Sequence, residues 1–493
     1  MFYPDLNEFI NFSKKGNLIP VYKEILADIE TPVSAFIKID NGKYSYLLES
    51  VEGGEKIARY SFLGSDPSII FLSKKGKAKI IENGKIKEIE KPGSPFKILK
   101  ELLKKYKPVS INGLPRFHGG AVGFLSYDMV RYFENIPDNN IDELNLPESL
   151  FVFTDTILVF DHINHSIKVV TNTYIDNNAN VKKLYEEAKI KIEAIINKLK
   201  KPLIIDNKNK FNKNKIKIKS NTVKKVFIQN VNKAKEYIRA GDIFQVVLSQ
   251  RLNINISCDP FDIYRALRKI NPSPYMFFLR MGEMIIVGSS PEILVRVENR
   301  CIEVRPIAGT RRRGKDEIED EKLKNELYND PKERAEHIML VDLGRNDIGK
   351  VSKYSSVHVP ELMTIEKNSH VMHMVTDVLG EIESDKDVFD CISATFPAGT
   401  VSGAPKIRAM EIIDELEKTR RGIYAGAVGY ISFSGNLDTC ITIRTILIKD
   451  GTAYIQAGAG IVADSIPEKE YEETLNKAMG MIKAIEMAEG GLE

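Results

Sequence analysis

The stretch FVFTDTILVF (151–160), followed closely by IKVVTNTY (167–174), is rich in the β-branched and aromatic residues that favour strands. Similar short runs lie upstream at SAFIKI (34–39), YSYLLES (44–50) and SIIFL (68–72). Gly, Pro and Asn residues, which are typical of turns, separate these runs. The pattern therefore predicts a strand-rich N-terminal region.

The composition changes after a predicted helix at 181–199. The segment 201–221 (KPLIIDNKNKFNKNKIKIKSN) is dense in Lys and Asn, which is typical of a surface loop or linker. Nucleic-acid binding by this run is disfavoured, because it lacks interleaved aromatic residues that could stack on bases. We therefore divide the chain into a strand-rich region (1–200), a linker or loop (201–221) and a C-terminal region (222–493).

Strands and helices alternate in the C-terminal region, and its Gly-rich segments indicate loops whose backbone amides can approach a ligand closely. The active site is therefore expected there. The pattern predicts helices near 223–239, 331–344, 403–418 and 468–488, and strands near 243–250, 275–297 and 426–447.

The chain has 493 residues, of which 43% are hydrophobic and 28% are charged, as in globular proteins with a large core. Its 71 basic and 68 acidic residues leave a net charge of +3, so neither nucleic acid nor a membrane is expected as a partner. The sequence offers no apolar run of about 18 residues and no export signal. The four cysteines form no CxxC pair, which fits a reducing environment, and we expect a cytoplasmic location.

Two acidic pairs lie on predicted helices at i, i+3 spacing, which places both carboxylates of a pair on one helix face. Glu333 and Glu336 adjoin the apolar stretch HIMLVDLG, and Glu470 and Glu473 follow the Gly-rich segment AGAGIVADS. Most such pairs in a chain with 68 acidic residues are solvated helix faces. Two facing pairs would suit Mg²⁺, which prefers one or two protein carboxylates together with substrate oxygens and water.

Two further residues stand out in apolar surroundings. His373 lies in NSHVMHMVTDVLGEI, where a histidine is more often a core or edge residue than a catalyst. Arg444 lies in TCITIRTILI, and this pattern predicts a strand that is apolar on both faces. A buried guanidinium needs an acidic partner, which is either a Glu or Asp of the protein or an acid of a ligand.

Several segments, taken in order, resemble the motifs of the chorismate-utilising enzyme family. The N-terminal half, with LLES (47–50) and ARYSFLG (58–64), resembles the large subunits of the anthranilate synthase branch of that family. The resemblance implies an α+β layered sandwich, with helices packed between outer β-sheets and the active site in the central cleft. The matching segments are GDIFQVVLSQR (241–251), GSSPE (288–292), RPIAGTRRRG (305–314), AEHIMLVDLGRND (335–347), PAGTVSGAPKIRAME (397–411), GAVGY (426–430), TIRT (442–445) and QAGAGIVADS (456–465).

The resemblance implies a magnesium-dependent lyase that acts on chorismate, a small dicarboxylate. Glu336 and Glu473 resemble the metal ligands, and Glu333 and Glu470 resemble residues that support them. One substrate carboxylate would thus meet Mg²⁺, while the other would meet an arginine and backbone amides.

The remaining roles also follow from the resemblance. Tyr424, Arg444 and the amide of Gly460 are expected to hold the enolpyruvyl carboxylate, and Lys477 matches a lysine near the metal site. Glu292 is the expected general acid for the departing hydroxyl group. The expected catalytic set is completed by His373, a base or orienting group, and by Thr310 and Thr400, which would position the ring.

Two positions favour the anthranilate branch. Family members that add water use a lysine where this chain has Gln245, and some aminodeoxychorismate synthases carry a nucleophilic lysine where it has Ala308. An aminodeoxychorismate synthase component without that lysine is the runner-up. The chain shows no amidotransferase segment, so a separate glutamine amidotransferase subunit is expected to supply ammonia.

A regulatory site for tryptophan is expected in the N-terminal region. LLES, with Glu49 and Ser50, and NPSPYMFF, with Pro274, Tyr275 and Met276, resemble the feedback site of the family. An acid would meet the amino group and apolar side chains would surround the indole. LLES also fits an ordinary strand, and a non-catalytic tryptophan-binding regulatory subunit is a further alternative.

Overall fold

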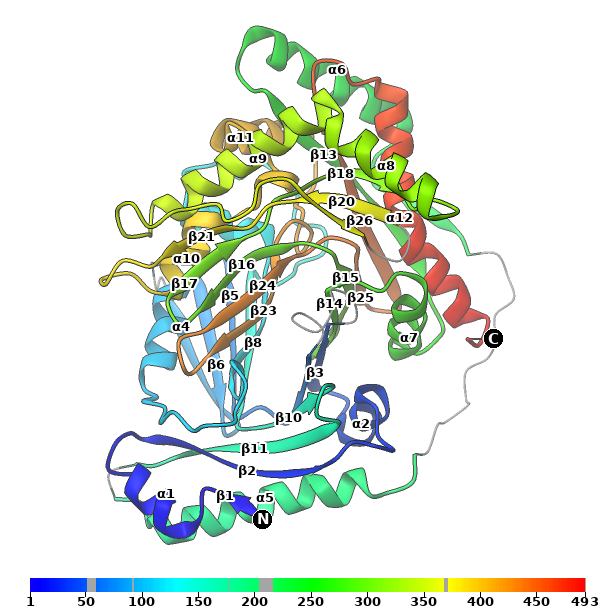
Figure 1. The fold of residues 1–493 in the computed structure, drawn as a ribbon. Coiled ribbons are helices and arrows are strands. Elements are labelled where there is room, and N and C mark those ends of the chain that lie inside the picture. The colour runs from blue at the N-terminus through cyan, green and yellow to red at the C-terminus, as the bar shows by residue number, and fades with distance from the viewer. Residues whose placement is uncertain (51–58, 91–92, 177, 204–215, 368–370, 493) are drawn as a thin grey trace.

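The computed structural model has the α+β class that the sequence predicts (Figure 1). Within the described ranges, no helix combines the length and the apolarity needed to cross a bilayer. The four cysteines carry free thiols. The structure describes residues 1–50, 59–90, 93–176, 178–203, 216–367 and 371–492.

The larger sheet has 13 strands in the described part of the chain and combines strands from both halves of the sequence. The antiparallel pairing of Glu49 with Met276 joins the halves. Its strands are β1 (Phe2–Tyr3), β2 (Leu18–Leu26), β3 (Tyr44–Glu49), β4 (Tyr60–Ser65), β10 (Thr156–Asp161), β11 (Ser166–Tyr174), β12 (Ile218–Ser220), β13 (Gln245–Asn255), β14 (Tyr275–Met281), β15 (Met284–Ser290), β22 (Gly403–Ala404), β25 (Thr445–Lys449) and β26 (Thr452–Ile461).

The second sheet, with ten strands among the described residues, also unites the two halves, here through the pairing of Phe124 with Val428. A separate small sheet has three strands in the order β18-β20-β19, and all three come from the C-terminal half of the chain. The strands of the second sheet are β5 (Ile69–Lys74), β6 (Lys77–Glu82), β7 (Lys85–Glu90), β8 (Gly120–Leu125), β9 (Ser149–Thr154), β16 (Ile293–Glu298), β17 (Cys301–Val304), β21 (Val378–Glu381), β23 (Ala427–Ser432) and β24 (Leu437–Ile441); those of the small sheet are β18 (Ile307–Arg312), β19 (Thr364–Lys367) and β20 (Val371–Val375).

Most helices lie on the outer faces of the two large sheets, as Figure 1 shows for α5 below β2 and β11, whereas α8 packs on the small sheet. This placement follows from the apolar face of each helix, which packs on the neighbouring sheet. The helices are α1 (Leu6–Phe12), α2 (Pro32–Ile39), α4 (Pro95–Lys104), α5 (Val181–Leu199), α6 (Lys224–Ala240), α7 (Pro260–Ile270), α8 (Glu317–Asn329), α9 (Pro331–Gly349), α10 (Val388–Thr395), α11 (Lys406–Leu416) and α12 (Pro467–Glu489), with short 3₁₀ helices at Tyr127–Tyr132 and Gly399–Val401.

The order of the layers differs from the expectation. One cluster of buried side chains fills the space between the two large sheets, with Tyr46 and Phe277 from one sheet and Phe124 and Tyr430 from the other. The sheets therefore pack directly on each other, and the helices cover them from outside. Large aromatic side chains on both inner faces favour this arrangement, because each buries its area fully only between two sheets.

Two predicted strands also need correction. SAFIKI is part of α2, because Thr31 caps the helix by accepting from the amide of Ser34 and Pro32 occupies its first turn. FVFTDTILVF is not one strand but two, β9 and β10, which separate at Asp155 and belong to different sheets. Most of the expected linker, 204–215, lies outside the described residues.

Candidate active site

Among the places where the chain passes from one large sheet to the other, the crossovers after β15 and after β24 lie next to each other. The first crossover contains Glu292 and the second contains Arg444. The amide of Ile441 donates to the carbonyl of Glu292 at 3.0 Å, and the amide of Ser289 donates to the carbonyl of Arg444 at 3.1 Å. Arg444 has a φ of 47°, so it lies at a break and not within the continuous strand that the sequence predicts.

Glu292 is a buried carboxyl group with 8% of its surface exposed. Burial raises its pKa to about 7, and the Thr400 hydroxyl and the charges of Arg444 and Lys477 partly oppose this shift. The geometry therefore brings four of the predicted site residues together. A carboxyl with this pKa is protonated in about half of the molecules at neutral pH, as a general acid requires.

A small cavity of about 50 Å³ lies beside Glu292 and Thr400, with Leu340 and Leu343 of α9 also in its wall. Arg444 and Tyr424 do not line it, so this cavity borders the Glu292 side of the site and does not outline the whole substrate site.

His373 and Thr310 face each other across β20 and β18. The Nδ1 atom of His373 lies 3.0 Å from the Thr310 hydroxyl and 3.2 Å from the carbonyl of Gly309, where an irregularity in the register interrupts β18. Burial and the charge of Arg444 lower the pKa of His373. The imidazole is therefore neutral near pH 7 and lies within the electrostatic reach of Arg444.

The acid pairs of α9 and α12 approach each other. Burial raises the pKa of Glu336, and the negative charges of Glu333 and Glu473 raise it further. Glu473 forms an ion pair of 2.7 Å with Lys477 on the next turn of α12. The pKa of Glu470 is likewise raised by burial and then by the charge of Glu473.

These carboxylates do not form a closed metal shell. Glu333 lies 3.0 Å from Arg311 in an ion pair. In the part of the chain that the structure describes, no three His, Cys, Asp or Glu side chains gather closely enough to hold a metal ion. Glu336 and Glu473 nevertheless supply hard oxygen donors whose mutual repulsion a divalent cation would relieve, and two carboxylates match the number that Mg²⁺ prefers.

Tyr424 lies against the glycines of β26. A Cβ atom at Gly458 would come within 2.6 Å of the Tyr424 hydroxyl oxygen, and the carbonyl of Gly458 accepts a hydrogen bond of 3.1 Å from Lys477. A Cβ atom at Gly460 would lie 2.6 Å from the side-chain nitrogen of Gln245. These glycines therefore let the Tyr424 and Gln245 side chains approach the strand.

Sequence reasoning missed a buried ion pair behind this site, between Arg421 and Glu417 at 2.7 Å. No helical spacing could have found this pair, because α11 ends at Leu416 and Arg421 lies beyond it. Their hydrogen bonds reach the backbone next to Thr400.

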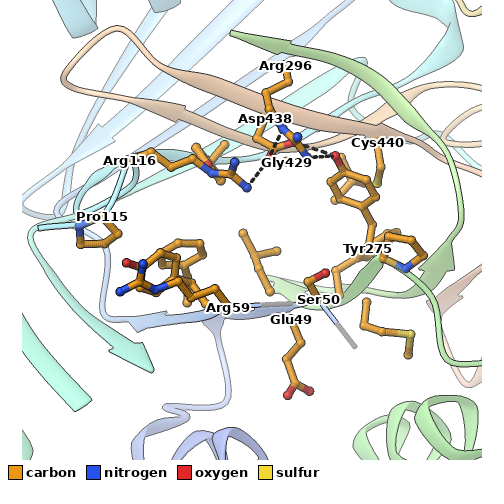
Figure 2. A pocket seen from close by; sticks show the side chains of 18 of the residues that line it. Glu49, Ser50, Arg59, Pro115, Arg116, Tyr275, Arg296, Gly429, Asp438 and Cys440 are labelled. Atoms are coloured by element: carbon orange, nitrogen blue, oxygen red, sulfur yellow. Dashed lines mark hydrogen bonds and ion pairs between the residues drawn. The ribbon is translucent and has the colours of Figure 1, made fainter. Parts of the chain in front are cut away.

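The residues expected to bind tryptophan line a different cavity, of about 600 Å³, between the two large sheets (Figure 2). Ser50, Pro274, Tyr275 and Met276 contribute to its wall. The Ser50 hydroxyl is buried and lacks a hydrogen-bond partner among the residues that the structure describes. Such a group favours a ligand that supplies a donor or an acceptor.

Glu49 is placed differently from its neighbour. Figure 2 shows its carboxylate pointing away from the cavity, on the other side of the strand from Ser50. It accepts hydrogen bonds from Tyr264 and Arg268 of α7, the latter at 3.1 and 3.2 Å. Glu49 also belongs to the wall of the cavity, while its carboxylate is engaged by Arg268 of α7 on the other face of the strand.

A network of charges forms one wall of the cavity (Figure 2). Asp438 accepts hydrogen bonds from Tyr275 and Arg116, each at 2.9 Å, and from Arg296 at 3.3 Å. Two guanidinium groups thus share one buried carboxylate, and each also pairs with a second acid, Arg116 with Glu298 at 3.5 Å and Arg296 with Glu303 at 3.4 Å.

Comparison with known proteins identifies the family of the chain. Residues 44–483 match the family of chorismate binding enzymes. The chain is 54% identical to anthranilate synthase component 1 of Acetivibrio thermocellus and 50% identical to that of Aquifex aeolicus, and each alignment covers 99% of both chains. A crystal structure of anthranilate synthase component I from Streptococcus pneumoniae is 37% identical, with a TM-score of 0.77 over 93% of this chain and 99% of that one. The resemblance noted in the sequence is confirmed, and the chain belongs to the chorismate binding enzyme family.

Proposed function

We propose that this chain is the chorismate-converting component of an anthranilate synthase, which turns chorismate and ammonia into anthranilate, pyruvate and water. Its similarity along the full length to anthranilate synthase component 1 of other organisms supports the proposal. The observation that carries it is the buried Glu292 carboxyl beside Arg444 and Lys477, with a pKa of about 7. This group supplies the acid that the reaction needs.

In the first step, ammonia forms a carbon–nitrogen bond to the ring while the 4-hydroxyl group departs. Hydroxide is a poor leaving group, so Glu292 gives its proton to the departing oxygen, which leaves as water. Thr310 and Thr400 position the ring. Arg444, Tyr424 and the amide of Gly460 hold the enolpyruvyl carboxylate.

In the second step, a ring proton is removed and the enolpyruvyl group leaves as pyruvate, which makes the ring aromatic. His373 is the candidate base or orienting group. Its Nδ1 faces the carbonyl of Gly309, so Nε2 is the nitrogen that would take the proton. The lowered pKa of His373 supports this role, because only the neutral imidazole accepts a proton.

Mg²⁺ is part of the proposal, with Glu336 and Glu473 as ligands and Glu333 and Glu470 as supporting residues. When bound, it would neutralise and orient the ring carboxylate of the substrate. The proximity of Glu336 and Glu473, which raises the pKa of Glu336, supports a cation between them. Lys477 neutralises part of the same negative charge through its ion pair with Glu473.

Two side chains support the choice of ammonia over water and over a lysine nucleophile. Gln245 is buried at the start of β13 beside Gly460, and an amide cannot deprotonate water. Ala308 is buried on β18 and cannot form a covalent bond to the ring. Both positions favour anthranilate as the product.

Two partners complete the proposal. A separate glutamine amidotransferase subunit supplies ammonia, which free ammonium replaces when the chain acts alone. Tryptophan binds in the 600 Å³ cavity and inhibits the enzyme, with Ser50 and the apolar residues Pro274 and Met276 at its wall. The size of this cavity and the buried Ser50 hydroxyl support a bound indole amino acid.

The test is incubation of the purified chain with chorismate, Mg²⁺ and ammonium, followed by the fluorescence of anthranilate and by an assay for pyruvate. We expect both products in equal amounts, dependence on Mg²⁺, and inhibition by tryptophan. Accumulation of a non-aromatic amino product would instead identify an aminodeoxychorismate synthase component. Tryptophan binding without turnover would identify a regulatory subunit.

A further inference from the structure

Arg421 occupies the centre of a buried network behind the candidate active site. Only 1% of its side chain is exposed. Its Nε and Nη2 donate to the two carboxylate oxygens of Glu417, at 2.9 and 2.7 Å, in the paired geometry that fixes a guanidinium plane. The guanidinium also lies over the rings of Tyr127 and Tyr424, with its central carbon 4.9 and 5.4 Å from the ring centroids.

The remaining donors of Arg421 reach two separate backbone segments. Nη1 donates to the carbonyl of Val401 at 2.7 Å, and Nη2 donates to the carbonyl of Val247 at 2.7 Å. Val401 follows Thr400, whose buried hydroxyl has no hydrogen-bond partner among the described residues but lies near enough to Glu292 to lower its pKa. Val247 lies two residues from Gln245 on β13 and pairs with Gly460 of β26. Arg421 thus connects, through hydrogen bonds, the segment that carries Thr400 with strand β13, which carries Gln245 and pairs with Gly460.

Glu417 extends the network to the same strands. Its carboxylate accepts from the amide and the hydroxyl of Ser249, at 2.8 and 2.9 Å, and the Ser249 hydroxyl accepts from Gln456 of β26 at 2.8 Å. The charge of Arg421 is therefore compensated by Glu417, which is itself held by Ser249 of β13.

We propose that Arg421 is a positioning residue of the reaction, which holds the Thr400 segment and the Tyr424 ring in register with Glu292 without touching the substrate. This inference rests on the proposed function. A lysine cannot replace Arg421, because a single ammonium group cannot bond Glu417 in the paired geometry and also reach two carbonyls on different segments while it lies between two rings.

The test compares Arg421→Lys with Arg280→Lys in the full chain. Arg280 is a control of similar chemistry, since it pairs with Asp40 at 3.1 Å and lies 5.5 Å from the Phe278 ring centroid, remote from the site residues. Steady-state anthranilate formation is measured from pH 5.5 to 9 at saturating Mg²⁺ and ammonium, and thermal unfolding is followed in parallel. A wild-type chain that forms no anthranilate overturns the proposed function before any variant is compared.

We expect Arg421→Lys to lower kcat/KM for chorismate roughly 10- to 100-fold, because small displacements of positioned groups are costly. We also expect the alkaline limb of its kcat profile to move to higher pH, since the Thr400 hydroxyl would no longer oppose the raised pKa of Glu292. Arg280→Lys should change kcat/KM less than threefold and leave the limb in place.

Equal kinetics of the two variants would overturn the proposal. The proposal would also be overturned if activity falls only in proportion to the folded fraction while the alkaline limb of the kcat profile stays in place. Arg421 would then have a structural role alone. If Arg421→Lys does not fold, Glu417→Gln serves in its place, because it keeps the guanidinium and weakens the pairing that orients it. The same loss of kcat/KM and the same shift of the limb are then expected.

Discussion

Lys477 lies 2.7 Å from the Glu473 carboxylate and 3.1 Å from the carbonyl of Gly458, so its ammonium group bridges α12 and β26. The same charge lowers the pKa values of Glu336 and Glu292 against the effect of burial. Lys477 therefore connects the acid pairs, where the metal is proposed, with the proposed general acid. A substitution among the acid pairs that moves Lys477 should therefore also change the pKa of Glu292.

Glu292→Gln should reduce kcat about 10²- to 10⁴-fold, the usual contribution of a general acid. Because Glu292 acts in its protonated form and has a pKa of about 7, wild-type kcat should fall as the pH rises through 7. The variant should lose this dependence. Glu303→Gln is the control, since burial also raises the pKa of Glu303 in β17, outside the site. A wild-type rate that increases steadily from pH 6 to 9 would contradict the assignment.

The same substitution should change how stability depends on pH. The folded-state pKa of Glu292 lies above its ordinary value of 4.5, so its contribution to stability is fully present below pH 4.5 and is lost as the pH rises through 7. Relative to wild type, Glu292→Gln should therefore become more stable as the pH increases from 4.5 to 8. Thermal unfolding of both proteins over this range tests the sign. A constant difference would show that the carboxyl is not shifted in the folded protein.

Glu336→Gln should raise the Mg²⁺ concentration required for half-maximal activity tenfold or more, because it removes a proposed ligand and its charge. The control is Glu326→Gln on α8, an exposed residue. Titration of activity with Mg²⁺ measures the metal requirement, and thermal unfolding without the metal measures any change in stability. Unchanged activity of Glu336→Gln at low Mg²⁺ would remove this residue from the metal site.

Ser50→Phe should relieve tryptophan inhibition and spare the reaction, since the larger side chain fills part of the 600 Å³ cavity and removes the buried hydroxyl. The measurement is the tryptophan concentration that halves anthranilate formation, together with KM for chorismate. Glu49→Gln is the informative comparison, because its carboxylate bonds Arg268 on the other face and the change should mainly cost stability. Undiminished inhibition of Ser50→Phe would place the tryptophan site elsewhere.

Gly458→Ala should displace the Tyr424 hydroxyl, which would lie 2.6 Å from the new Cβ atom. The new Cβ atom would also come within 3.0 Å of the Leu248 carbonyl oxygen and of the Val247 side chain on β13. We expect kcat/KM for chorismate to fall roughly 10- to 100-fold, and thermal unfolding measures the accompanying change in stability. Gly349→Ala, at the end of α9, is the control, because its Cβ would meet nothing within 4 Å. Equal kinetics of the two variants would show that Tyr424 does not contribute to substrate binding.

Much of the secondary structure was predictable from local patterns. The helix at 181–199 has the predicted bounds, and the helices predicted near 331–344 and 468–488 correspond to α9 and α12. SAFIKI was misread, because a capping threonine and a proline outweigh the strand preference of its apolar residues. Motif order was also sufficient to identify the family, which the comparisons confirm.

The sequence by itself therefore determined most of the elements and the family, and it supplied the candidate residues of the site. Only the tertiary structure decided that FVFTDTILVF divides between two sheets, that Glu292 and Arg444 meet at adjacent crossovers, and that Glu49 faces away from Ser50. The physical reason is that an apolar pattern specifies which side chains are buried, whereas the sheet that a strand joins depends on contacts between residues far apart in the chain. The shifted pKa of Glu292 has the same origin, since burial and distant charges create it.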